Sequence, residues 1–398
     1  MKILSIRVGS NILFPEGINI DLKTSDRVRK GLERHDYYRS AYQIKTGIYN
    51  QVLMSVVGLN ATGKTAILQL ICFIANIVLL HRSLDTVAYL LEKFHVTKEH
   101  PFKFSVEIFH ENNVYLLESE IIKDNGSYFY KDEILYKLPL SKFARNINKN
   151  SFKIVMNRKD EATNVFLKSD ESIIKCISSQ KGTFVCNLGA VNFNYPGWEG
   201  EPPSQIIKIF DSGIKSLKIE NSEFCEIKKA KALIQFERES GVSEKSLITL
   251  ENIVSSGTIK GLTIFPGLMS VLSSGGLIVL DEIENHLNKK LITFILDLFT
   301  DKRTNPKGAC LIFSTHYPEL LDYFTRKDNI YVSRKDDDDE YLHLLRFSDS
   351  DKVKRNDILK SKILLLNVIN GTAPKFSLLT EAKNKVIELL NLEDQSVG

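Results

Sequence analysis

The chain has 398 residues, which is enough for one large domain or two of ordinary size. Hydrophobic residues make up 43% of it, a share that excludes an intrinsically disordered protein. The net charge of +4 is too small to indicate a strong nucleic-acid binder, although a local basic face would not show in this sum.

The cysteines are scattered and include no CxxC pair, so they predict neither a disulfide framework nor a zinc site. Reduced thiols in a cytosol are the simpler interpretation. The first residues, MKILSIRVGS, lack the apolar core of a signal peptide. The longest apolar stretch, 66–80, contains Gln69 and Asn76 and is too short to span a bilayer. We therefore expect a cytoplasmic protein with no membrane partner. The cysteines are Cys72, Cys176, Cys186, Cys225 and Cys310.

The first elements alternate between strand-like and irregular patterns. Residues 3–7 and 17–21 alternate apolar and polar side chains, which predicts half-buried strands. The charged stretch 24–49 is predicted to be an inserted helix or loop. The valine-rich run 51–58 is typical of a buried strand, and a long apolar helix is predicted to begin near Lys64.

The next region predicts an antiparallel meander followed by an insertion. Residues 103–138 alternate strongly, with turn signals at 111–113 and at Asn125–Gly126. The pattern then weakens, and a proline- and glycine-bearing loop lies at 195–203. We interpret residues 139–205 as an inserted, helical region.

The second half predicts strands that alternate with helices. The pattern of residues 206–220 predicts a helix followed by a strand. The patterns of residues 232–239 and 245–251 predict the two strands of a second hairpin. The segments GGLIVLDE and GACLIFSTH are typical of buried strands separated by a helix, which favours parallel pairing. The acidic run 336–340 is predicted to be a solvated hairpin turn.

The fold class predicted from these elements is α/β. It has a mixed or parallel core sheet, an antiparallel β subdomain and an inserted helical region. The predicted division is an N-terminal lobe at 1–138, the inserted region at 139–205, a C-terminal lobe at 206–376 and a tail at 377–398.

The segment GLNATGKT fits the pattern G-x-x-x-x-G-K-[ST] between a predicted strand and a predicted helix. Such a loop lets successive backbone N–H groups converge on phosphate oxygens, aided by the positive end of the helix. Lys64 is expected to bridge the β- and γ-phosphates, and Thr65 to ligate Mg²⁺. The alternative is a glycine turn that precedes a helix by chance. The position of the segment between a predicted strand and a predicted helix makes this alternative less favourable. The candidate nucleotide-binding residues are Gly58, Leu59, Asn60, Ala61, Thr62, Gly63, Lys64 and Thr65.

The segment LIVLDE ends a predicted buried strand with two carboxylates. Ligands of parallel sheets bind at the carboxyl ends of the strands. Asp281 is the expected second Mg²⁺ residue, and Glu282 the expected general base that polarises an attacking water. Alone, the segment could equally be a strand that runs into a polar loop.

Three more segments follow in a characteristic order. VSSGT starts a predicted helix, where hydroxyls and a glycine can hold an anion or simply cap the helix. NHLN follows Glu282 directly, and FSTHYPELLD places His316 at the end of a buried strand. This order resembles the ABC ATPase superfamily. It is similar, more narrowly, to the AAA family ATPases of prokaryotic abortive-infection and anti-phage systems. That group includes AbiL-like and RloA-like proteins and, more distantly, the Septu ATPase PtuA.

The resemblance covers most of residues 1–22, 51–138 and 206–376. Within it, this chain departs from the family pattern, since Val254 stands in place of a glutamate, and Asn288 and Lys289 stand where the family has a His-Pro pair. The glutamine that such ATPases carry in a lid loop has no counterpart that we can assign.

The resemblance implies a head-to-tail dimer that hydrolyses ATP with Mg²⁺ at its interfaces. Each ATP would lie between the phosphate loop of one subunit and the signature of the other. His316 would contact the γ-phosphate within its own subunit. The signature residues that would reach it from the other subunit are Ser255, Ser256 and Gly257.

The function favoured by this resemblance is the sensor or regulatory ATPase of a bacterial anti-phage defence system. It would work with a separate effector protein such as a nuclease or toxin, since the last 22 residues are too few for a nuclease domain. One alternative is a DNA-repair or DNA-binding ATPase of the RecF or SMC type, although no long heptad run occurs. Nucleic acid is therefore a candidate partner. A third alternative is the motor subunit of a membrane transporter, against which the long insertion, the atypical signature and the early antiparallel strands argue. A fourth is a clamp that binds ATP and hydrolyses it very slowly.

Overall fold

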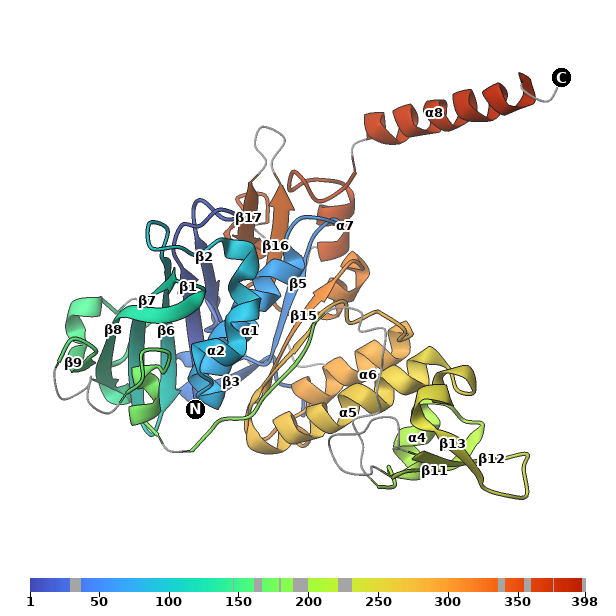
Figure 1. Cartoon of the computed structure of the whole chain (residues 1–398), viewed down its shortest axis with the longest axis horizontal. Helices are drawn as coiled ribbons and strands as arrows, with labels where there is room; N and C mark the ends of the chain where they lie inside the picture. Colours follow the sequence, from blue (N-terminus) through green and yellow to red (C-terminus); the bar gives the residue numbers. More distant parts are fainter. Residues whose placement is uncertain are drawn as a thin grey trace.

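The computed structural model describes residues 1–28, 37–145, 147–160, 167–178, 180–188, 200–220, 231–335, 341–353, 359–374 and 376–395. It contains four β-sheets and several covering helices (Figure 1). The predicted α/β class with a mostly parallel core sheet and separate antiparallel sheets is confirmed.

The core sheet has six strands, and all of its neighbouring pairs are parallel except the last. The three strands that follow the first are wholly buried, as expected for parallel strands that helices cover on both faces. In spatial order the strands are β10 Phe184–Asn187, β14 Leu277–Leu280, β15 Cys310–Thr315, β5 Leu53–Val57, β16 Ile330–Lys335 and β17 Leu342–Arg346.

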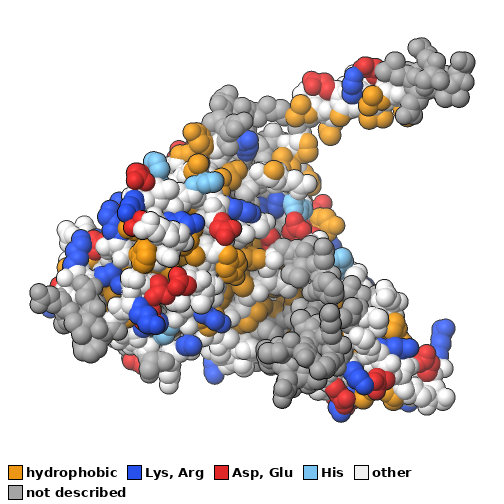
Figure 2. All heavy atoms as spheres, in the orientation of Figure 1, with side chains coloured by type: hydrophobic (Ala, Val, Ile, Leu, Met, Phe, Trp, Pro, Cys, Tyr) orange, Lys and Arg blue, Asp and Glu red, His pale blue; other side chains and the backbone are white. Residues whose placement is uncertain are grey.

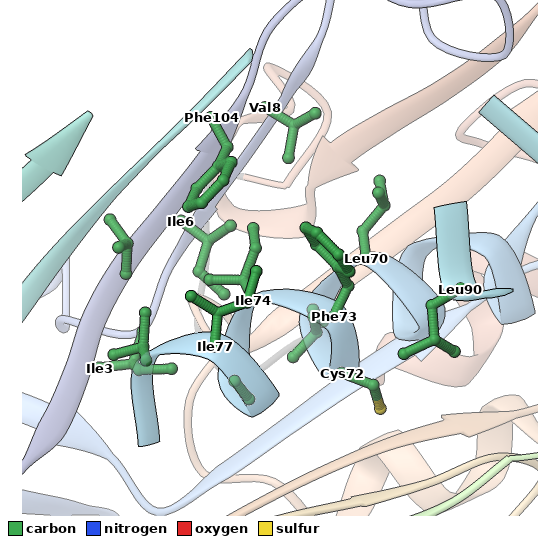
Figure 3. Close-up of a cluster of buried hydrophobic side chains, with 14 of the residues drawn as sticks. Ile3, Ile6, Val8, Leu70, Cys72, Phe73, Ile74, Ile77, Leu90 and Phe104 are labelled. Carbon is green, nitrogen blue, oxygen red and sulfur yellow. The ribbon is translucent and has the colours of Figure 1, made fainter. Parts of the chain in front are cut away.

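Helix α1, Lys64–Leu80, covers one face of the core sheet and begins at the residue that the sequence predicted. It is apolar nearly all round because a second sheet packs on its other side. Figure 3 shows Phe73 and Ile77 of α1 in one cluster with Ile6 and Phe104 of that second sheet. The helix that follows the phosphate loop is therefore held between two sheets.

The other face of the core sheet is covered by α5, Ser256–Ser274, and α6, Lys289–Thr300. Successive side chains of a strand point to opposite faces. Accordingly, Met54 and Val56 of β5 belong to the cluster of α1, and Leu53 and Val57 to that of α5 and α6.

The second sheet is the antiparallel meander that the sequence predicted at 103–138, extended by neighbouring strands. Its turns contain Glu111, Asn112 and Asn125 with positive φ, followed in the last case by Gly126. In spatial order its strands are β2 Ile18–Asp21, β1 Lys2–Val8, β6 Phe102–His110, β7 Asn113–Asp124, β8 Ser127–Pro139 and β9 Lys153–Asn157.

A third, three-stranded sheet lies beside the start of α5 and has its own apolar cluster. It confirms the predicted helix and strand at 206–220. The predicted strand at 245–251 is mostly wrong, because a 3₁₀ helix, Leu247–Asn252, replaces it after Ser246. The elements of this unit are α4 Ser204–Phe210, β11 Ile214–Glu220, β12 Lys231–Phe236 and β13 Ser243–Ser246.

Two other regions differ from the sequence prediction. Within 24–49 the chain forms the hairpin β3, Ala41–Lys45, and β4, Ile48–Gln51, where we expected a helix or loop. The described part of 139–205 contains strands and short 3₁₀ turns rather than a helical insertion before Ser204. Its strand β10 joins the core sheet beside β14, a pairing with a segment about 90 residues away that local periodicity cannot encode.

The C-terminal part contains α7, Lys360–Leu365, and α8, Phe376–Gln395. Helix α8 extends away from the rest of the chain (Figure 1), and its apolar side chains are exposed (Figure 2). Strands β16 and β17 pair as an antiparallel hairpin, although the acidic run 336–340 itself lies outside the described residues.

No helix in the described ranges is long and apolar enough to cross a bilayer. A short helix, α2 Leu84–Val87, follows α1.

Candidate functional site

The loop between β5 and α1 is shaped by two glycines that have no room for a side chain. A Cβ on Gly58 would lie 2.1 Å from the carbonyl oxygen of Ser333. Gly63 has a φ of +89°, and its Cβ would lie 2.5 Å from Leu342 Cδ1. Ala61 also has a positive φ of 62°, and Thr62 Oγ1 donates to the carbonyl of Leu59 at 2.8 Å. The loop therefore turns tightly against the β16–β17 hairpin and enters α1 with its first N–H groups free of helical partners.

Lys64 places a buried cation over this loop. Its Nζ donates to the carbonyl oxygens of Gly58 and Leu59 at 2.9 and 2.7 Å. Burial lowers the pKa of this ammonium, while the carboxylates of Glu282 and Asp281 oppose the shift. The positive charge thus lies in a poorly hydrated place between the loop and two carboxylates, where it interacts strongly with an anion.

Thr65 and Asp281 meet across the gap between α1 and β14. Thr65 Oγ1 donates to Asp281 Oδ2 at 2.8 Å, and the hydroxyl of Ser314 donates to Asp281 Oδ1. Ser314 also accepts the backbone N–H of Glu282 at 2.7 Å. The two predicted metal residues are therefore neighbours, and a serine of β15 fixes the carboxylate that follows β14.

Glu282 has a strained backbone and a tightly held side chain. Its φ is 47°, a conformation that costs an ordinary residue about 1–3 kcal/mol and is typical of functional sites. Its Oε2 accepts from Asn285 Nδ2 at 2.6 Å, and its Oε1 lies 3.2 Å from His316 Nε2. Burial raises the pKa of the Glu282 carboxyl, but the hydrogen bonds from His316 and Asn285 outweigh burial and lower it overall. The carboxylate is therefore ionised at neutral pH, and its orientation is fixed by hydrogen bonds with the side chains of Asn285 and His316.

Glu282 and His316 share one pocket of about 830 Å³, and Lys64 contacts its lining through the carbonyls of Gly58 and Leu59. It is lined by loop residues 57–60, by Glu282 and His316, and by a wall from the C-terminal part of the chain. In this wall Thr372 is held by its hydroxyl bonds to the carbonyls of Leu364 and Ile369 at 2.8 and 2.7 Å. The wall residues are Pro318, Leu364, Leu365, Thr372, Ala373 and Pro374. Such a volume suits a nucleotide-sized ligand.

The residues Ser255, Ser256 and Gly257 lie apart from this pocket. Ser255 caps α5, since its Oγ accepts the N–H of Thr258 at 3.1 Å. A Cβ on Gly257 would lie 2.5 Å from the carbonyl oxygen of His286, so the helix start packs on the segment after Glu282. Within one chain these residues cap a helix and do not line the pocket of Glu282 and His316.

The donor set fits Mg²⁺ bound mainly through a ligand's phosphates. Mg²⁺ prefers oxygen ligands and keeps several waters, so one hydroxyl and one carboxylate suffice when phosphates complete its shell. Thr65 and Asp281 offer these two oxygens side by side. Across the described residues no group of three or more His, Cys, Asp or Glu could hold a metal by itself.

Sequence reasoning missed three residues of this site. Ser314 joins Asp281 to Glu282, and its signal was its place two residues before His316 on a buried strand. Glu284 accepts the backbone N–H of His316. Lys260 of α5 is buried, and burial lowers the pKa of its ammonium, while the charges of Asp281 and Glu282 raise it. No local sequence pattern indicated this residue.

One comparison with known proteins identifies a family. The family model described as "AAA domain, putative AbiEii toxin, Type IV TA system" matches residues 53–322, which is more than half of the chain. The match begins at β5 and ends shortly after His316, so it spans the phosphate loop, the two carboxylates after β14 and the histidine after β15. No curated protein matches the chain.

Proposed function

Because the chain belongs to this family of AAA domains, which are P-loop ATPases, we propose that it binds ATP with Mg²⁺ and hydrolyses it in the pocket of Glu282 and His316, next to Lys64. One observation supports this above the others. Thr65 of the phosphate loop bonds to Asp281, while the next residue, Glu282, bonds to His316 in a pocket that the start of the phosphate loop also lines. Binding groups and hydrolytic groups from separate segments of the chain are thereby brought together.

Each residue has a role that its position suggests. The amides of the phosphate loop and the Lys64 ammonium hold the phosphates, where charge-assisted hydrogen bonds are strong. Mg²⁺, held by Thr65 and Asp281, would neutralise charge on the β- and γ-phosphates. The ionised Glu282 orients a water toward the γ-phosphorus and accepts its proton, and Asn285 and His316 keep that carboxylate in place. His316, 3.2 Å from Glu282, is placed to report whether the γ-phosphate is present.

We extend the proposal to a head-to-tail dimer. The start of α5 carries two serine hydroxyls at the positive end of a helix, where an anion is favoured, although Ser255 already caps the N–H of Thr258. The support is the resemblance to ABC ATPases, in which the signature of one subunit meets the phosphates that the other subunit holds, and here that signature would be Ser255, Ser256 and Gly257. ATP bound between the two surfaces would then stabilise the closed dimer through its higher affinity for that state.

We also propose that the ATPase acts in antiviral defence together with a separate effector. The support is the family's description, which names a toxin of a type IV system, and the resemblance to abortive-infection ATPases. The pocket wall includes Leu364 and Leu365 of α7 and ends at Pro374, close in sequence to the start of α8, so we propose that the exposed apolar side chains of α8 respond to the nucleotide.

The decisive experiment uses the Glu282→Gln variant with ATP and Mg²⁺. We expect nucleotide binding without turnover, and light scattering should report a stable dimer or a larger complex. Glu319→Gln changes an exposed glutamate close to His316 and serves as the control, which should hydrolyse ATP normally. If Glu282→Gln stays monomeric with ATP bound, the dimer is wrong while ATP binding stands. If calorimetry detects no nucleotide binding to the wild-type protein, the proposal as a whole is wrong.

A further inference from the structure

Two cysteines that lie far apart in the sequence meet beside the helix that follows the phosphate loop. Cys72 lies in the middle of α1, and Cys186 lies on β10, the edge strand of the core sheet. Neither lines the pocket of Glu282 and His316. In Figure 3 the Cys72 sulfur points away from Ile74 and Ile77.

The alternation of β10 directs Cys186 toward α1. Phe184 belongs to the same apolar cluster as Cys72, whereas Val185 packs on the opposite face, where a Cβ on Gly267 of α5 would lie 2.9 Å from it. Because side chains two residues apart on a strand share a face, Cys186 lies on the α1 side together with Phe184.

The alignment of α1 with this segment brings the two thiols level. The N–H of Gly182 donates to the carbonyl of Leu79 at 2.7 Å, which fixes one point of contact. From Leu79 back to Cys72 the helix rises about 10 Å, and from Gly182 to Cys186 an extended chain advances about 13 Å. These lengths nearly match and α1 packs on β10, so the two side chains lie level with each other, and each thiol influences the pKa of the other.

The two thiols differ in the way that a redox pair requires. Cys186 is exposed, and the hydrogen bond from Cys72 lowers its pKa. Cys72 is fully buried, and burial raises its pKa. Redox-active cysteines are accessible, have a depressed pKa and lie next to a second thiol that resolves the first oxidation product.

We propose that Cys72 and Cys186 are a redox-active pair that hydrogen peroxide closes into a disulfide. The Cys186 thiolate attacks peroxide, the O–O bond breaks, and the sulfur becomes a sulfenic acid with release of hydroxide. The Cys72 sulfur then attacks that sulfur, the S–O bond breaks, and the departing hydroxide takes the Cys72 proton as water. In sum, two thiols and one peroxide give one disulfide and two waters. A dithiol reductant reverses the change.

The pair lies at a position from which such a bond would constrain the nucleotide site. Asn187, the residue after Cys186, accepts the N–H of Asp281 at 2.9 Å through its carbonyl oxygen. Its side-chain oxygen also accepts from Lys260 of α5 at 3.3 Å. The disulfide would tie the phosphate-loop helix to the strand that carries both of these contacts.

The experiment treats the full chain with peroxide, blocks the remaining thiols by alkylation and maps the unreduced peptides by mass spectrometry. We expect a Cys72–Cys186 linked peptide, lighter by two hydrogen atoms than its parts, that disappears after dithiothreitol. Cys176→Ser removes another exposed thiol and should leave the link unchanged. Cys186→Ser should abolish it, and because this side chain is exposed the variant should melt close to the wild-type temperature.

Two results would overturn the inference. In one, Cys186 is oxidised to its sulfinic acid while Cys72 is recovered as an alkylated thiol. In the other, Cys186 is linked to a different cysteine, such as Cys225. Because the readout is a peptide mass, it does not depend on ATP hydrolysis, and a failure here leaves the proposed ATPase function untouched.

Discussion

The hydroxyl of Thr65 donates a hydrogen bond of 2.8 Å to the carboxylate of Asp281, a residue 216 positions later in the chain. This contact joins the first turn of α1 to the end of β14. It places two oxygens side by side at the carboxyl edge of the core sheet, where open α/β sheets bind their ligands. Substitutions at this contact and around it therefore test the site most directly.

Thr65→Val keeps the size of the side chain but removes its hydroxyl. We expect the Mg²⁺ concentration for half-maximal hydrolysis to rise about tenfold or more, because one oxygen of the site is lost. A Mg²⁺ titration of the ATPase rate measures this. Thr65→Ser retains the hydroxyl and should stay near the wild-type midpoint. An unchanged midpoint in Thr65→Val would exclude Thr65 from the metal site.

Lys64→Ala removes the buried cation from the phosphate loop. Hydrogen bonds to charged groups contribute about 1.5–3 kcal/mol, so ATP affinity should fall about 10- to 100-fold by calorimetry. Lys98→Ala removes an exposed lysine that is paired with Asp124 and should bind as the wild type does. Equal affinities for the two variants would contradict the phosphate-binding role.

Ser314→Ala tests the serine that joins Asp281 to Glu282. The change leaves the N–H of Glu282 and one Asp281 oxygen without this partner, and Ser314 is fully buried. We expect the free energy of unfolding to fall by about 1–3 kcal/mol in urea titrations. Turnover should also fall, because Glu282 loses its backbone anchor. Ser273→Ala, at an exposed end of α5, should lie within about 0.5 kcal/mol of the wild type.

His316→Ala tests the origin of the lowered Glu282 pKa. Because the folded-state pKa is depressed, the carboxylate stabilises the fold above the ordinary glutamate value of about 4.3. That contribution is lost as the pH falls through the folded-state pKa. Carbon NMR of the Glu282 carboxyl should therefore titrate below that ordinary value in the wild type. The midpoint should move upward in His316→Ala, which removes one of the two hydrogen bonds. A midpoint that does not move would assign the shift to Asn285 instead.

Gly58→Ala tests the close approach of the loop to β16. The new Cβ would meet the carbonyl oxygen of Ser333 at 2.1 Å, so backbone must shift. Overpacking of this kind costs about 1–3 kcal/mol of unfolding free energy, and ATP binding should weaken as the loop moves. Gly241→Ala, where a Cβ meets nothing within 4 Å, is the matched control. Equal melting temperatures for the two variants would show that the loop can relax at no cost.

Local patterns predicted the parts of the site that follow one another in the chain. The start of α1 at Lys64 was marked by a glycine turn and a long apolar run, and β14 by apolar residues that end in two carboxylates. The hairpin β3–β4 was missed because charged and aromatic side chains hide its alternation. Strand β10 was missed because it has only four residues, and its partner β14 lies far along the chain.

The sequence by itself determined the phosphate loop, the strand that ends in Asp281 and Glu282, and the α/β class, because glycine geometry and hydrophobic periodicity act over a few residues. The tertiary structure alone decided that Ser314 joins Asp281 to Glu282, that His316 faces Glu282, and that α1 with Cys72 packs on β10 with Cys186. Those contacts depend on the order and register of strands in the sheet. These are set by the burial of whole faces against α1, α5 and α6, not by the residues next to them in the chain.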